Sequence, residues 1–262
     1  MSTLNNIKIG ADPEFFMINK EGKFISAIDR IGGSKSDPRP IDDRGFAVQE
    51  DNVAVEFNIP AATSKQEFIN SIEFALSYLN EELKKMELTI AALPSAFFPP
   101  EELANPKAFE FGCEPDLNVW TKTVNPRPVL PEDQLNLRSA GGHIHVGYDD
   151  PQEEVNEQII KSMDIFVGVP ALQFDKDSLR RKLYGKAGCF RFKPYGVEYR
   201  TLSNFWLQSP DYVNFVYDQT MKAIDFVKNN GEIHPDTMLH VCNAINKGNE
   251  KSAEWVMKKY GC

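Results

Sequence analysis

The sequence predicts one α+β domain over residues 1–262, because strand-like segments and long amphipathic helices are mixed along a chain without an internal repeat or a linker. The 262 residues are 42% hydrophobic and 26% charged, as in a soluble globular protein with a full-sized core. The net charge of −9 argues against nucleic acid or a membrane surface as a partner, because such anionic partners require a basic footprint.

Targeting and redox signals indicate a cytosolic protein. The N-terminus lacks the charged start and apolar core of a signal peptide, and no apolar run approaches the ~18 residues that would cross a bilayer. The four cysteines are scattered and form no C-x-x-C pair, which argues against a structural zinc site or a disulfide framework. We therefore expect a reducing, cytoplasmic environment.

Residues 6–18 are expected to form the first strand. Side chains alternate between the two faces of a strand, so Asp12 and Glu14 point the same way. Pro13 lies between them and cannot donate a hydrogen bond to a neighbouring strand. This predicts either an edge strand or a strand that is locally interrupted at the proline.

The next strand is expected within residues 48–60. Glu56 and Asn58 share one of its faces, while the opposite face is apolar. A solvated outer face is the simplest explanation of that pattern. The preceding loop, residues 32–45, is polar but lacks the Gly-Lys-Ser/Thr ending of a phosphate-binding loop.

Helical patterns occupy much of the rest of the chain. Ser64–Met86 is the clearest, because Ser64 and Glu67 form a capping box and an apolar stripe recurs at helical spacing. Ser209 and Pro210 are typical of a helix start, and that helix is expected to end near residue 229. Further helices are expected at 151–169, 235–246 and 249–260, with the C-terminal helices of about 210–262 packed on the domain.

The chain is organised around residues 138–147, with the sequence RSAGGHIHVG. His143 and His145 are two residues apart and therefore share one face of an extended strand. Gly141 and Gly142 let the backbone enter this strand tightly, or let a ligand approach it closely.

Two irregular or basic segments flank this strand. Residues 94–136 are rich in proline and form an irregular connection around 111–117, long enough to be functional or a small subdomain. Residues 179–193 form the one basic segment of an acidic protein. They precede a strand at 196–204, on which Glu198 and Arg200 share a face.

Four strands thus each present two polar residues on one face: Asp12 with Glu14, Glu56 with Asn58, His143 with His145, and Glu198 with Arg200. Any single pair is common on a solvated sheet, but together they gather carboxylates, imidazoles and a guanidinium. Carboxylates brought close repel one another unless a cation lies among them. Oxygen-rich ligation with an occasional imidazole suits Mg²⁺ or Mn²⁺ better than zinc, and Arg200 suits a transferring phosphoryl group.

These motifs carry a family resemblance. Asp-Pro-Glu, Val-Glu-Phe-Asn, Gly-Gly-His-Ile-His-Val-Gly and Val-Glu-Tyr-Arg resemble the sheet motifs of the glutamine synthetase and glutamate–cysteine ligase superfamily, and most closely its phage-type carboxylate–amine (COOH·NH2) ligases. The similar segments run from Gly10 to about Trp206. The resemblance implies a curved, mostly antiparallel sheet with one open face, helices packed on the other face, and ATP with Mg²⁺ (or Mn²⁺) on the open face.

The resemblance also implies roles for individual residues. Metal ligation is implied for Glu14, Glu56, His143 and Glu198, with Asp12 a weaker candidate because the larger relatives have a glutamate there. Arg200 is expected to bind the transferred phosphoryl group, with Glu198 and Arg191 as the other catalytic candidates. The remaining candidates for nucleotide or substrate binding are Arg138, His145, Arg180, Arg181, Tyr184, Lys186, Asn58 and Asn204, although a solvated loop is the alternative for the basic segment.

The implied activity is an ATP-dependent ligase that converts a carboxylate into an acyl-phosphate and joins it to an amine, releasing ADP and phosphate. Glu50 or Asp51 is a positional candidate for the proton acceptor. The substrates are expected to be small molecules or peptides, a homo-oligomer is left open, and a phage origin would place the protein in the host cytoplasm.

Two other classes compete with the ligase. A metal-dependent hydrolase or a cupin would use the H-x-H strand, but only His234 and His240 remain as further histidines, both in the C-terminal helical region. A non-catalytic binding protein that has kept the sheet is the second alternative. Because the acidic, imidazole and guanidinium positions are all present, we favour the ligase.

Overall fold

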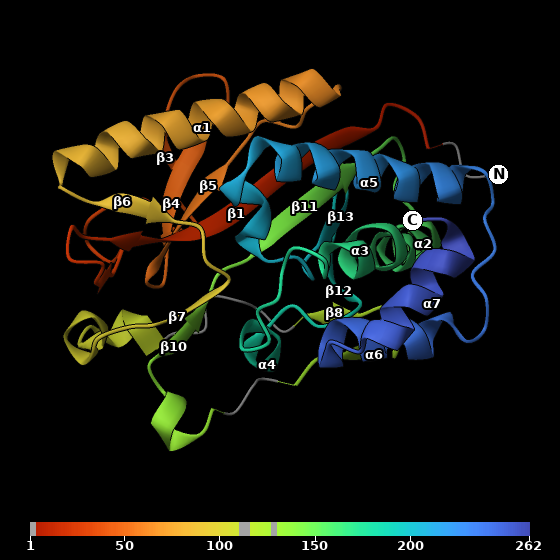
Figure 1. Ribbon diagram of the computed structural model, residues 1–262. Coiled ribbons are helices and arrows are strands. Elements are labelled where there is room, and N and C mark those ends of the chain that lie inside the picture. The colour runs from red at the N-terminus through yellow and green to blue at the C-terminus, as the bar shows by residue number, and fades with distance from the viewer. Residues whose placement is uncertain (1–3, 110–115, 127–129) are drawn as a thin grey trace.

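The computed structural model of the protein describes residues 4–109, 116–126 and 130–262, and it is dominated by one large antiparallel sheet (Figure 1). Its strands are ordered β3-β4-β5-β1-β11-β13-β12-β8-β9, and β2 and β6 also pair with β1. The strands are β1 (Lys8–Ile18), β2 (Phe24–Ile25), β3 (Arg39–Pro40), β4 (Ala47–Asp51), β5 (Ala54–Asn58), β6 (Thr89–Ala91), β8 (Leu117–Asn118), β9 (Thr123–Val124), β11 (Gly142–Gly147), β12 (Cys189–Lys193) and β13 (Gly196–Tyr199). This open sheet with helices confirms the predicted fold class, whereas the assignment of residues 1–262 to one domain stays a prediction.

The helices begin and end close to the predicted residues. Ser64 caps α1 (Lys65–Lys85) by accepting a hydrogen bond from the Glu67 amide, and Ser209 caps α5 (Pro210–Lys228) in the same way. These signals are local, which is why the sequence alone located both helices. The others are α2 (Glu153–Met163), α3 (Val169–Ala171), α4 (Arg180–Leu183), α6 (Thr237–Lys247) and α7 (Glu250–Tyr260).

The predicted helix over 151–169 is confirmed in its extent, but its second half contains a π-helical turn. After α2 the chain makes a π-helical turn, η4 (Asp164–Gly168), before α3 begins. Pro170 follows directly, and a proline can neither donate a helical hydrogen bond nor fit against the preceding turn. The turn places the fully buried carboxylate of Asp164 against the sheet.

Pro13 does not place β1 at an edge, which corrects one of the two alternatives drawn from the sequence. β1 is central, between β5 and β11. Its even-numbered residues bond towards β11, as the Glu14 amide does to the Gly141 carbonyl, whereas Ile9 bonds towards the opposite side at Ala62. Pro13 therefore faces the β5 side, where the β1–β5 register covers only residues 14 and 15. The second alternative, a local interruption, is what the structure contains.

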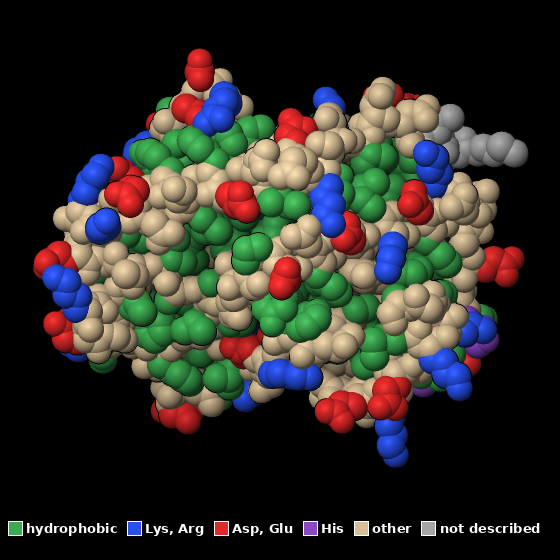
Figure 2. Space-filling view, turned by 45° about the horizontal axis from the view of Figure 1, so that its top comes forward, with side chains coloured by type: hydrophobic (Ala, Val, Ile, Leu, Met, Phe, Trp, Pro, Cys, Tyr) green, Lys and Arg blue, Asp and Glu red, His purple; other side chains and the backbone are tan. Residues whose placement is uncertain are grey.

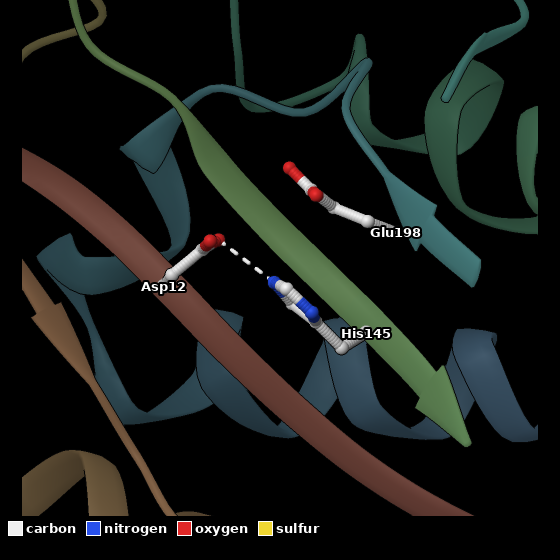
Figure 3. Close-up of side chains that lie close together, drawn as sticks. All are labelled: Asp12, His145 and Glu198. Atoms are coloured by element: carbon white, nitrogen blue, oxygen red, sulfur yellow. Dashed lines mark ion pairs between the residues drawn. The ribbon is translucent and has the colours of Figure 1, made fainter. Parts of the chain in front are cut away.

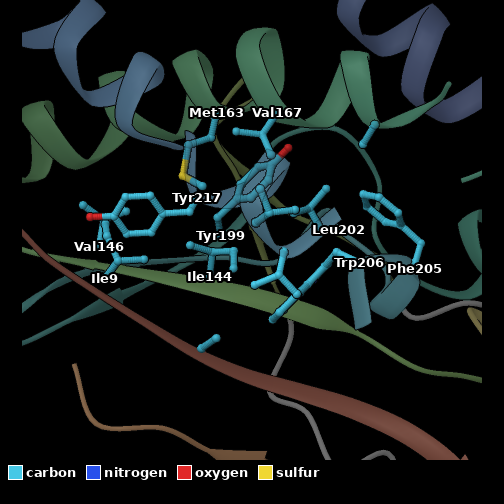
Figure 4. Packing of buried hydrophobic residues seen from close by; sticks show 14 of the residues in the cluster. Ile9, Ile144, Val146, Met163, Val167, Tyr199, Leu202, Phe205, Trp206 and Tyr217 are labelled. Atoms are coloured by element: carbon cyan, nitrogen blue, oxygen red, sulfur yellow. The ribbon is translucent and has the colours of Figure 1, made fainter. Parts of the chain in front are cut away.

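The apolar face of the central strands packs on the helices. Figure 4 shows Ile144 and Tyr199 of the sheet facing Met163 and Val167 from α2 and η4. All four side chains are fully buried. Burial on this side directs the alternate residues of the same strands to the other face of the sheet.

The connection over 94–136 is mostly irregular, as predicted, but it also contains the short strands β8 and β9 of the main sheet. It contributes β7 (Ser95–Phe97), which pairs with β10 (Leu137–Ser139) in a separate two-stranded sheet seen below the main sheet in Figure 1. Short 3₁₀ turns complete it: η1 (Pro100–Leu103), η2 (Pro106–Phe109) and η3 (Glu132–Gln134), with a further turn η5 (Asn204–Gln208) after β13. Residues 110–115 and 127–129 of this connection lie outside the described residues.

The described helices are all too short or too polar to cross a membrane. On the face seen in Figure 2, acidic and basic side chains are interspersed among apolar ones.

Candidate active site

The sheet register carries the predicted polar residues to one face. Three cross-strand pairs lie directly opposite one another: Glu56 with Glu14, Asp12 with His143, and His145 with Glu198. Directly opposed residues of an antiparallel sheet point to the same side. Segments as far apart in sequence as β1 and β13 therefore contribute to a single site.

Asp12, His145 and Glu198 form one candidate metal cluster, in which the ligand atoms of the three residues lie within 4.8 Å of one another. Figure 3 shows their side chains close together over β11. His145 Nε2 is 3.1 Å from Asp12 Oδ1. His143 adjoins the same carboxylates, with its Nδ1 3.3 Å from Asp12 Oδ1 and 3.7 Å from Glu198 Oε1.

The electrostatics keep both carboxylates of this cluster ionised. Burial would raise the pKa of Asp12, but the adjacent imidazoles of His145 and His143 hold it well below its usual range. Burial likewise opposes ionisation of Glu198, yet the guanidinium of Arg200 outweighs it and lowers the pKa of Glu198 to about 2. Two anionic carboxylates in a buried site present the charge that a divalent cation requires.

Glu14, Asp51 and Glu56 form a second acidic cluster, also with carboxylate oxygens within 4.8 Å of one another. The Gly141 amide donates to Glu14 Oε2 at 2.7 Å, and Gln49 Nε2 donates to Glu56 Oε1 at 2.9 Å. Burial and the negative charge of Asp51 raise the pKa of Glu14 to about 8. The cluster is thus short of positive charge, which a proton or a cation would supply.

Glu50 and Asp51, the two candidates for proton acceptor, have different surroundings. The Glu50 carboxylate accepts hydrogen bonds from four consecutive backbone amides, residues 29–32, at 2.8–3.1 Å. It is therefore occupied in holding that loop. Asp51, at the other position, lies in the second acidic cluster.

Arg200 is buried between two carboxylates. One guanidinium nitrogen contacts Glu198 Oε1, and Nε lies 2.8 Å from Asp116 Oδ1. The Tyr184 ring lies 5.1 Å from the guanidinium carbon. The two carboxylates hold the planar group in one orientation. Sequence reasoning missed Asp116, whose only signal was its place in the proline-rich connection.

The β12–β13 hairpin supplies two further cations. Arg191 lies opposite Glu198 in the sheet, with its Nε 4.0 Å from Asp116 Oδ1. Lys193 Nζ lies 2.7 Å from Glu198 Oε2. Sequence reasoning missed Lys193 as well, although it ends the basic segment that had been singled out.

Three other predicted arginines are engaged with protein groups. Arg138 donates to the carbonyls of residues 108, 135 and 137, in the two-stranded sheet region. Arg180 is buried and donates to the carbonyls of residues 140, 201 and 202, at the ends of the site strands. Arg181 donates to carbonyls 175 and 177. Their expected roles in nucleotide or substrate binding stay predictions.

The last predicted residues lie at varied distances from the clusters. Asn204 is fully buried, and its Nδ2 donates to the Glu14 carbonyl, so it stabilises the backbone of β1 at a residue of the second acidic cluster. Tyr184 contacts Asp116 and the His143 ring. Asn58 ends β5 opposite Ala47, and Lys186 accepts a hydrogen bond from Thr201 through its backbone carbonyl.

The two glycines before His143 make room for neighbours. A Cβ on Gly141 would lie 2.4 Å from His143 Nε2, and one on Gly142 would lie 2.3 Å from the Ser203 carbonyl. The sequence offered two explanations for these glycines, tight entry of the backbone into the strand or close approach of a ligand. The contacts with His143 and Ser203 support the first explanation.

The fold and this face define an α+β protein with carboxylates, imidazoles and guanidinium groups gathered on one sheet. Residues 134–246 match the family model described as Phage phiEco32-like COOH.NH2 ligase-type 2. The match includes His143, His145, Glu198 and Arg200, and over these residues the chain is similar to the phage-type carboxylate–amine ligases, which confirms the resemblance found in the sequence.

Solved structures also match. Apo GmaS is 12% identical, with a TM-score of 0.44 over 96% of this chain and 65% of that chain. A bifunctional glutathione synthetase from Pasteurella multocida is 9% identical, with a TM-score of 0.45 over 98% of this chain and 46% of that chain. The present chain thus spans less than two thirds of the length of each. A comparison with curated proteins found no match.

Proposed function

We propose that the protein is an ATP- and Mg²⁺-dependent ligase that joins a carboxylate to an amine through an acyl-phosphate, releasing ADP and phosphate. The observation that carries this proposal is the cluster of Asp12, His145 and Glu198 beside the buried guanidinium of Arg200. The family match over residues 134–246 supports the same reaction class.

The donor groups fit Mg²⁺ or Mn²⁺. Both clusters are mainly carboxylate, with one imidazole in the first, and hard divalent cations prefer such oxygen-rich ligands. The raised pKa of Glu14 indicates that the second cluster is short of positive charge. Bound cations would offset the negative charge of the phosphates and of the carboxylate to be activated.

In the first proposed step, a substrate carboxylate oxygen attacks the γ-phosphorus of ATP, and the bond from that phosphorus to the bridging oxygen breaks to release ADP. Glu198 and Asp116 hold the guanidinium of Arg200 in one orientation beside the first cluster, where its positive charge would stabilise the transferred group. Lys193, whose Nζ lies 2.7 Å from Glu198 Oε2, adds a second positive charge.

In the second step, the amine nitrogen attacks the acyl carbon and the carbon–oxygen bond to phosphate breaks. The proton of the amine passes to a carboxylate, for which Asp51 is the candidate that remains, since the Glu50 oxygens are occupied by backbone amides. The products are an amide and phosphate. ATP consumption assigns the reaction to the cytoplasm, that of the host if a phage encodes the protein.

The geometry disfavours the hydrolase that the H-x-H motif also predicts. His234 and His240 both adjoin the Trp255 ring, and His240 stacks on it with ring centroids 4.0 Å apart. Neither joins His145 in a metal cluster among the described residues.

The test is thermal unfolding with Mg²⁺ and a non-hydrolysable ATP analogue, for wild type, Glu198→Ala and the surface control Glu82→Ala. Ligand binding raises native-state stability by roughly 2.7 kcal/mol at a hundredfold excess over Kd. We expect a metal-dependent shift in wild type and the control, and none in Glu198→Ala. The absence of a shift in wild type would refute the nucleotide site. A shift would justify screening acids and amines for ADP release.

A further inference from the structure

His145 is held by two residues from different parts of the chain. Its Nδ1 forms a short hydrogen bond with the Tyr195 hydroxyl, and the two rings lie 6.0 Å apart at 34°. Its Nε2 lies 3.1 Å from Asp12 Oδ1. The Tyr195 hydroxyl thus contacts the nitrogen on the side of the β12–β13 turn, and the other nitrogen lies beside the acidic cluster.

The turn that carries Tyr195 is itself anchored to the strand of His145. The Tyr148 amide, just past the end of β11, donates to the Tyr195 carbonyl at 3.1 Å. Gly196 follows with a φ of +146°, a backbone conformation that favours glycine, and a Cβ there would lie 2.1 Å from the Val146 carbonyl. Tyr195 thus reaches His145 from a backbone position set by β11.

The inner end of the imidazole has the surroundings of a metal ligand. His145 Nε2 and Asp12 Oδ1 are both buried and form an ion pair at 3.1 Å, although their orientation lies outside strict hydrogen-bond geometry. A ligand oxygen of Glu198 lies within 4.8 Å of both. Adjacent polar atoms that converge in this way suit a shared cation.

We propose that Tyr195 is a positioning residue that fixes the tautomer of His145, the imidazole of the cluster with Asp12 and Glu198. When Nδ1–H donates to the Tyr195 oxygen, the lone pair lies on Nε2 and points at the cluster. A metal-bound imidazole commonly donates its other N–H to such a partner. This inference rests on the proposed function and gives His145 a role different from the nucleotide or substrate binding predicted from the sequence.

The experiment is Mn²⁺ binding to the metal-free, nucleotide-free protein, followed by EPR titration and by pulsed EPR of the bound ion. The variants are His145→Gln and Tyr195→Phe, which keeps the ring and removes only the hydroxyl. Tyr212→Phe on α5, where the ring packs on Phe174 and Phe205, is the matched control. Nitrogen coupling in the pulsed spectrum reports a coordinated imidazole directly, which a loss of packing alone would not change.

We expect a 10–100-fold rise in the Mn²⁺ Kd of Tyr195→Phe, a reduced nitrogen coupling in His145→Gln, and wild-type behaviour in Tyr212→Phe. Wild-type affinity and coupling in His145→Gln would overturn the ligand assignment. Weakened binding in His145→Gln together with wild-type binding in Tyr195→Phe would overturn the role of Tyr195. If wild type itself binds no Mn²⁺, this inference fails together with the metal-dependent reaction, and that result differs from the other two.

Discussion

Asp164→Asn is expected to flatten the pH dependence of stability, because the Asp164 carboxylate is buried behind the site strands. Its Oδ2 accepts from Trp120 Nε1 at 2.6 Å, and its Oδ1 accepts from the Tyr199 hydroxyl at 2.8 Å and from Thr201 at 3.3 Å. Burial nevertheless outweighs these bonds and raises the pKa of Asp164 to about 6. The group links the helical layer to the two residues on either side of Arg200.

The magnitude follows from the difference between folded and unfolded states. A pKa of about 6 in the fold against 3.8 in an exposed aspartate corresponds to roughly 3 kcal/mol. Between those values the folded protein binds more protons than the unfolded chain, so the Asp164 contribution to unfolding free energy falls as pH rises. About 1.4 kcal/mol of that loss is expected between roughly pH 5 and pH 7.5.

Asparagine can keep the hydrogen bonds without the charge. Its oxygen can accept from Trp120 and its amide can donate to the Tyr199 hydroxyl. Urea unfolding, followed by tryptophan fluorescence at both pH values, gives the difference between the variant and wild type. Other titrating groups cancel in that difference, which should grow by about 1.4 kcal/mol from the lower to the higher pH. The same difference at both values would refute the reasoning.

Three further substitutions test the site and its support. Arg200→Lys should lower ADP-forming turnover by about 10²-fold or more, because an ammonium cannot contact Glu198 and Asp116 and also bind the phosphoryl group. Wild-type turnover in this variant would contradict the role of Arg200 in binding the phosphoryl group. Gly141→Ala would place a Cβ 2.4 Å from His143 Nε2 and displace that ring. Calorimetry should therefore show about 10–100-fold weaker Mn²⁺ binding, whereas an unchanged affinity would mean that the ring has room to move. Glu50→Gln leaves one oxygen for four backbone amides and should lower the urea unfolding free energy by about 1–3 kcal/mol, with an unchanged midpoint as the contrary result.

Local signals in the sequence located much of the fold. The caps at Ser64 and Ser209 and the helical spacing of apolar residues predicted α1 and α5 to within about two residues. Alternation along each strand predicted which side chains share a face, and the cross-strand register agrees with that pattern. Both are properties of short segments, so one sequence is enough to infer them.

Long-range contacts were harder to infer. Asp116 and Asp51 carry no local pattern that separates them from surface acids, and only the folded chain brings them to Arg200 and to Glu14. The contacts of Asp164 escaped prediction for the same reason, since its partners Trp120 and Tyr199 are tens of residues away. The resemblance supplied the expected metal ligands, but it did not distinguish the surroundings of the two strand histidines.

The proline in the central strand also bears on how the sheet assembles. A slip of β1 by one residue would send Asp12 and Glu14 to the helical side and bury their charges among apolar side chains. The same slip would turn Pro13 towards β11, where its missing N–H would remove a hydrogen bond from the β1–β11 ladder. In the native alignment Pro13 faces away from β11, so its missing N–H removes no hydrogen bond from the β1–β11 ladder. Pro13 thus disfavours a sheet in which β1 has slipped by one residue, and the native alignment avoids both penalties.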